Sequence, residues 1–145
     1  AKNAIASKFE ELSLDKQTLV KENEELNEQR ATFVTLNLNG KLRGCIGSLL
    51  AHRTLFDDLV HNAQAAAFSD PRFSALSKEE FEKVSIEISL LSKPEVLEYS
   101  DFEDLKQKLI PKKHGVILEL DGKRDSHWSF YRGRAHFRRH PHRTT

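Results

Sequence analysis

The residues best suited to chemistry lie in one short segment, residues 42–47, with the sequence Leu-Arg-Gly-Cys-Ile-Gly. If this segment is a β-strand, Arg43 and Cys45 point to one face, because successive side chains alternate between faces. The permanent charge of Arg43 would then favour the thiolate form of Cys45, which is the nucleophilic form. Gly44 and Gly47 carry no side chain, so a ligand can approach the main chain closely.

Cys45 also has a purely structural interpretation. It is the only cysteine in the chain, which excludes an internal disulfide and a cysteine metal cluster. A free cysteine is among the most buried residue types, and glycines within strands often mark bulges or tight packing. On the residues alone, the structural interpretation is the stronger one.

Two further groups are candidates for the same site. Histidine titrates near neutral pH, so His114 would act as a base toward Cys45 or hold a substrate, although a lone histidine more often makes only local hydrogen bonds. Asp70 and Arg72 flank a proline and would either rigidify a turn as a pair or bind an anionic group. The fixed geometry that the proline gives the turn favours the structural role.

Hydrophobic periodicity predicts the elements that position these residues. Residues 32–38 alternate apolar and polar side chains and lead into Asn39-Gly40, the dipeptide favoured in two-residue hairpin turns, so residues 41–49 form the return strand. The stretch before them, residues 1–30, is helix-prone but has only a thin apolar stripe.

Turn and cap signals predict the elements that follow. Thr54 caps a helix with an acidic first turn, which ends near Ser69 ahead of Pro71. The further predicted elements are a helix opened by a capping box at 77–80, a strand with one wet face over 84–90, a helix over 101–109, and a strand over 114–120 that ends in an Asp-Gly turn.

The last 21 residues are a different kind of sequence. Residues 1–124 hold 18 Lys and Arg against 21 Asp and Glu, whereas residues 125–145 hold five Arg, four His and one Asp, with no Leu, Ile or Val to form a returning strand. We interpret 1–124 as one domain, incomplete at both ends, and 125–145 as an aberrant, disordered basic tail that is read out of frame or otherwise damaged. The coding DNA tests this, because an alternative frame should encode an apolar strand.

The basic tail has two functional alternatives. Its interleaved arginines and aromatic residues would bind nucleic acid, or His136 and His140 would share a helix face around a metal. Pro141 interrupts such a helix, and no carboxylate or cysteine completes the ligand set. We therefore predict no metal site and rank nucleic-acid binding below the other functions.

Composition restricts the class of protein. No run approaches the roughly 18 apolar residues of a membrane helix, and no basic, hydrophobic leader opens the chain. We expect a soluble cytoplasmic protein without a membrane partner. The chain has no methionine, so we expect its first residue to fall inside a longer N-terminal segment.

Residues 42–48 closely resemble the AMMECR-type domain family, which includes the A component of the prokaryotic AmmeMemoRadiSam system. Residues 62–68, 70–73, 86–92 and 114–116 match in the family's order, so the resemblance covers about residues 1–124. It implies an α+β fold, with an antiparallel sheet flanked by helices and a cleft near residues 42–47.

The resemblance also implies partners, namely a Memo-like dioxygenase-fold protein and a radical SAM protein, but it supplies no settled activity, cofactor or oligomeric state. Family members continue past Arg124 with a strand and a C-terminal helical portion, which this chain lacks or carries in aberrant form.

Two functional hypotheses follow. In the first, the protein is an enzyme or an enzyme partner in a modification pathway, with Cys45 as nucleophile or covalent anchor, Arg43 activating it and His114 as base. In the alternative, it is a non-catalytic binding or scaffold module with a cleft for a ligand or peptide at residues 42–47, in which Gly44, Gly47, Asp70 and Arg72 make the contacts.

Overall fold

A computed structural model describes residues 1–10, 12–110, 113–120 and 123–125, and the chain divides into two compact units, Ala1–Lys93 and Pro94–Thr145. The elements of the first unit are α1 (Lys2–Ala6), α2 (Lys16–Glu22), the 3-10 helix η1 (Glu24–Asn27), β1 (Thr32–Leu38), β2 (Lys41–Gly47), α3 (Leu55–Phe68), α4 (Lys78–Phe81) and β3 (Ser85–Leu90). Those of the second unit are α5 (Phe102–Lys108), β4 (Leu118–Leu120) and β5 (Lys123–Asp125).

The first unit is built on a three-stranded antiparallel sheet of order β2-β1-β3. Its hairpin turn has Asn39 at φ 51° and Gly40 at φ 74°, both in the left-handed region that this turn requires and that these two residue types tolerate. The predicted hairpin is therefore confirmed, although β2 ends at Gly47 and not at residue 49.

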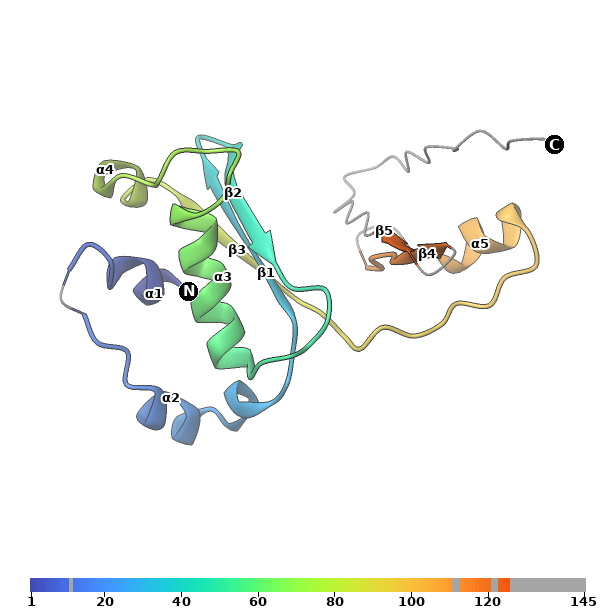
Figure 1. Ribbon diagram of the computed structural model, residues 1–145, viewed down its shortest axis with the longest axis horizontal. Coiled ribbons are helices and arrows are strands. Elements are labelled where there is room, and N and C mark those ends of the chain that lie inside the picture. The colour runs from blue at the N-terminus through green and yellow to red at the C-terminus, as the bar shows by residue number, and fades with distance from the viewer. Residues whose placement is uncertain (11, 111–112, 121–122, 126–145) are drawn as a thin grey trace. The chain divides into compact units, whose positions relative to one another are not determined.

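Helix α3 lies against one face of the sheet, as Figure 1 shows. Thr54 caps its first turn by accepting a hydrogen bond from the main-chain N–H of Asp57, as predicted. The buried core between helix and sheet is small and consists of Ala4, Ile5, Val34, Leu36, Ala63, Ala66, Ala67 and Leu76. The α+β class predicted for the chain is thus confirmed, with the helix-prone N-terminal stretch forming short helices.

Gly44 is required where α3 approaches β2. A Cβ atom at this position would overlap the carbonyl oxygen of Ala66, which belongs to the helix backbone and has no side chain that could turn aside. Small residues on both elements therefore set the distance between helix and sheet.

Strand β3 differs from its prediction in one respect. The predicted capping box at Ser77 and Glu80 is confirmed, and β3 follows it. The apolar side chains of β3 lie opposite the core-facing residues of β1, as expected for a strand with one wet face, but this apolar side is incompletely covered, since Ile88 is 43% exposed and Leu90 is 50% exposed. Ile86 packs against the core, whereas these two residues extend beyond it.

The second unit confirms the helix predicted over residues 101–109, with Asp101 capping α5. The strand predicted over 114–120 is reduced to β4, because the N–H groups of Lys113 and His114 both bond to the carbonyl of Ile110 and hold this stretch in a turn. A return strand does exist, since β5 pairs with β4.

The turn at 121–122 and the tail from residue 126 lie outside the described residues, as do both functional interpretations of that tail. In the described ranges, no helix is long and apolar enough to cross a membrane.

Replacement of Gly44 by alanine should destabilise the protein strongly, because the new methyl group meets helix backbone. We expect the free energy of unfolding in urea to fall by about 3 kcal/mol. Gly40→Ala is the comparison, because its only penalty is the left-handed backbone of a residue with open space around it, about 1 kcal/mol. A Gly44→Ala protein as stable as Gly40→Ala would contradict the close helix contact.

Candidate functional site

Cys45 lies on the face of the sheet opposite α3. The residues of β1 that face the core are Thr32, Val34 and Leu36, and all three are fully buried. Thr35 therefore points to the other face, where Cys45 is its cross-strand partner. The Cys45 Sγ lies 3.2 Å from the Thr35 Oγ1, and the residue as a whole is partly exposed.

The main chain of Cys45 is held from the open edge of β2. Its N–H donates to the Asp70 Oδ2 at 2.9 Å, and its carbonyl accepts from the Arg72 Nη2 at 3.1 Å. Together these two side chains take the place that a neighbouring strand would have. The sequence-predicted residues Asp70 and Arg72 are thus brought to Cys45.

Asp70 is a buried carboxylate whose partners are all donors. Besides the Cys45 N–H, it accepts from the main-chain N–H of Arg72 at 3.1 Å and from the Arg72 side chain at 3.0 and 2.7 Å. The bonds from the Arg72 guanidinium, helped by the main-chain N–H groups, hold the pKa of Asp70 well below its usual range despite burial. The predicted rigid turn is therefore present as an ion pair, while binding of an external anion stays a prediction.

Arg43 forms an ion pair with a different carboxylate, that of Glu80. Its Nε and Nη2 donate to the two carboxylate oxygens of Glu80 at 2.9 and 2.8 Å, and this pairing lowers the pKa of Glu80 to about 2. The register shifts beside Arg43, because Leu36 faces Gly44 while Asn37 faces Leu42. This bulge interrupts the alternation of side chains between the two faces of β2. The guanidinium that bonds to Cys45 is that of Arg72 and not that of Arg43. Activation of the thiol by Arg43 stays a prediction.

One aromatic ring lies between the two ion pairs. The guanidinium carbon of Arg43 is 5.8 Å from the centre of the Phe73 ring, and that of Arg72 is 5.5 Å from it. Both cations thus gain a cation–π contact with a ring that is itself partly buried. The connection from Asp70 to Glu80 therefore contacts β2 at two points, at Cys45 and at Arg43.

The two glycines of the segment are accounted for by packing within the chain. Gly44 accommodates the carbonyl of Ala66, and a Cβ atom at Gly47 would overlap the ring of Phe33. Their predicted role in bringing a ligand close to the main chain stays a prediction.

His114 belongs to the second unit, where its exposed ring accepts a hydrogen bond from the Ile110 N–H at 3.2 Å. Its proposed action as a base toward Cys45 also stays a prediction. Among the described residues, no group of three His, Cys, Asp or Glu is arranged to hold a metal ion.

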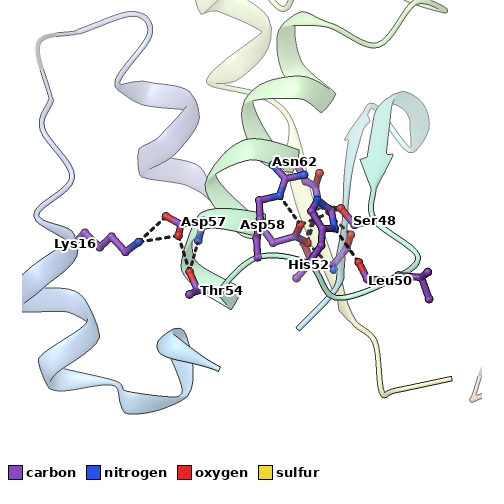
Figure 2. Close-up of polar contacts among 10 residues, drawn as sticks. Lys16, Ser48, Leu50, His52, Thr54, Asp57, Asp58 and Asn62 are labelled. Carbon is purple, nitrogen blue, oxygen red and sulfur yellow. Dashed lines mark hydrogen bonds and ion pairs between the residues drawn. The ribbon is translucent and has the colours of Figure 1, made fainter. Parts of the chain in front are cut away.

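Sequence reasoning missed a second polar cluster, at the start of α3. Figure 2 shows Asp58 and Asn62 of the helix converging with Ser48. The Asp58 carboxylate accepts from the main-chain N–H and the hydroxyl of Thr32, both at 2.8 Å, from the Asn62 amide at 2.9 Å and from the Ser48 hydroxyl at 2.9 Å.

This cluster joins α3 to one end of the β1–β2 hairpin. Arg53 supplies a cation at 3.4 Å from the carboxylate of Asp58. A signal was available in the sequence, because Asp58 and Asn62 fall on the helix face of Leu55 and Ala66, where apolar residues are expected. An acidic first turn by itself predicts only a favourable interaction with the helix dipole.

Neutralising Asp58 should cost far more stability than neutralising its neighbour. Asp58→Asn replaces a carboxylate that is 1% exposed and surrounded by donors, and we expect a loss of about 3 kcal/mol. Asp57→Asn is the matched control, because Asp57 is 42% exposed and pairs with Lys16, a contact worth less than about 1 kcal/mol. Equal losses in urea unfolding would contradict the structural role of the cluster.

Glu80 should make the protein sensitive to acid. Its pKa in the folded state, about 2, lies below the ordinary value of 4.5, so its stabilisation is complete above pH 4.5 and is lost as the pH falls toward 2. In urea unfolding at each pH, the difference between wild type and Glu80→Gln should shrink over this range. Glu79→Gln, on the same turn, should follow wild type. Parallel curves for wild type and Glu80→Gln would show that the pair with Arg43 is not formed in solution.

Comparison with known proteins identifies the family. The family model described as AMMECR1 matches residues 1–128. The protein Mbar_A1807 of Methanosarcina barkeri is 37% identical over 92 residues, which is 63% of this chain and 45% of that protein. The protein SSO0193 of Saccharolobus solfataricus is 39% identical over 115 residues, 76% of this chain and 51% of that protein. The chain thus spans about half the length of these relatives.

A solved structure agrees with the sequence comparisons. The crystal structure of the uncharacterised protein PH0010 from Pyrococcus horikoshii superposes with a TM-score of 0.64 at 28% identity, covering 77% of this chain and 57% of that one. The match to the family model extends over both the Cys45 strand and the Asp70–Arg72 turn. On this evidence, the chain is a member of the AMMECR1 family.

Proposed function

We propose that the protein is an enzyme partner in a modification pathway of the AmmeMemoRadiSam type, where it presents Cys45 to a group supplied by another component. The observation that carries the proposal is the way Cys45 is held. Its N–H, its carbonyl and its Sγ each have a partner within 3.2 Å, while the side chain stays partly exposed.

Burying a carboxylate in order to hold one residue costs free energy, and the stability of the fold does not require it. An edge-strand N–H can bond to water, whereas Asp70 is a carboxylate withdrawn from water to bind it. Such support fits a residue whose position matters for function, because a site must be held to within about 0.5 Å of its working geometry.

The contacts favour a partner over a self-sufficient thiol enzyme. A nucleophilic cysteine is activated by a base within hydrogen-bond reach or by an uncompensated cation beside the thiol. In the described part of the first unit, the hydrogen bond found for the Cys45 Sγ is to a hydroxyl, and Arg43 is neutralised by Glu80. The group that reacts with Cys45, or the base that activates it, would then come from a Memo-like or radical SAM protein in the cytoplasm.

A second function is a binding module in which the thiol has no chemical role. Leu42 and Leu50, which precede and follow Cys45 in the sequence, are both exposed, and their apolar side chains would contact a peptide or small ligand. This alternative predicts that Cys45 can be replaced without loss of function.

The two functions separate when Cys45→Ser is assayed in the full chain with the other pathway components. We expect capture of the Memo-like and radical SAM proteins to persist and the modification to fall at least about tenfold, because the presented thiol is gone. Cys45→Ala is the control for the serine hydroxyl. If either variant leaves the modification within twofold of wild type, the proposal is wrong and the binding module stands.

The rate at which iodoacetamide alkylates Cys45 distinguishes a thiol that is only presented to a partner from one that the protein itself activates. A thiol that is only presented should react at pH 7 no faster than cysteine in a short peptide. A rate more than about tenfold above the peptide would instead support a self-sufficient nucleophile.

A further inference from the structure

Strand β2 is an edge strand, and its open edge is a hazard for the protein. In the part of the chain that the structure describes, β1 is its only strand partner. Unpaired N–H and C=O groups along such an edge form a template on which another chain can add as a further strand.

The outward groups at the middle of this edge are those of Cys45, and both are occupied. The Asp70 carboxylate accepts from its N–H, and the Arg72 guanidinium donates to its carbonyl. The bulge at Arg43 adds a local twist to the same edge, which further hinders strand addition.

We propose that the Asp70–Arg72 pair is a guard that prevents a second copy of this chain from adding to β2. A two-fold antiparallel pairing centred on Cys45 is self-complementary, because the N–H of each Cys45 would bond to the carbonyl of the other. These are the two groups that Asp70 and Arg72 take. The neighbouring cation, Arg43, is neutralised by Glu80 and does not repel a second copy.

The single cysteine makes the pairing directly detectable. In a hydrogen-bonded antiparallel pair the two Cα atoms lie about 5.5 Å apart, within the range of a disulfide. Oxidation by diamide removes two electrons and two protons from two thiols, and any cross-linked dimer of this chain must join Cys45 to Cys45. The rate of cross-linking therefore reports how readily two Cys45 residues meet.

The test compares wild type with Arg72→Gln and with Asp70→Asn/Arg72→Gln in the full chain. In the double variant both outward groups of Cys45 lose their charged partners, so we expect sedimentation without oxidant to show a concentration-dependent dimer, and cross-linking at least about tenfold faster than in wild type. In Arg72→Gln the Asp70 carboxylate still accepts from the Cys45 N–H, so we expect a smaller rise in cross-linking. Arg72→Gln leaves the Asp70 carboxylate, which is 2% exposed, without its cation, whereas the double variant removes both charges together and should be the more stable of the two.

Two controls separate pairing from simple exposure of the thiol. Alkylation by iodoacetamide measures the exposure of Cys45 in each variant, and Lys16→Gln breaks an exposed ion pair on α2 and α3 instead of the edge of β2. Lys16→Gln should behave as wild type. A folded double variant that stays monomeric, or cross-linking that rises only in proportion to alkylation, would contradict the proposal. If the double variant does not fold, an Arg72→Gln protein that cross-links no faster than wild type would contradict it in the same way. Because no pathway component is present, this outcome is independent of the proposed function.

Discussion

The close approach of α3 to β2 is the constraint on which the rest of the first unit depends. The carbonyl of Ala66 occupies the space beside Gly44, so the helix can lie against the strand. Asp70 follows Ala66 by four residues, and Cys45 follows Gly44 by one. A contact between two small residues therefore determines where a buried carboxylate meets the edge of the sheet.

Charge in this region is balanced pair by pair. Arg72 is paired with Asp70 and Arg43 with Glu80, and the ring of Phe73 lies against both guanidinium groups. Arg72 also donates to the carbonyl of Cys45, so one of the two paired cations lies next to the residue that carries the thiol. The arrangement fixes the main chain of Cys45 in position, and activation of its thiol stays a prediction.

Local features could be predicted from the sequence because their partners are a few residues apart. The Asn39-Gly40 turn, the Thr54 cap and the Ser77–Glu80 capping box are of this kind. Choosing among carboxylates for Arg43 required the fold, since Glu80 lies 37 residues away. The strand expected at His114 failed for a local reason, because the carbonyl of Ile110 captures the following N–H groups in a turn.

The Asp58 cluster stabilises one register of β1 against α3 over its alternatives. Thr32 gives Asp58 two of its hydrogen bonds, one from the main chain and one from the side chain. A slip of β1 by one residue would turn Thr32 to the opposite face and leave the buried carboxylate short of donors. An apolar contact can adapt to such a slip, but a dehydrated charge cannot. Misaligned hairpins are thereby penalised in energy.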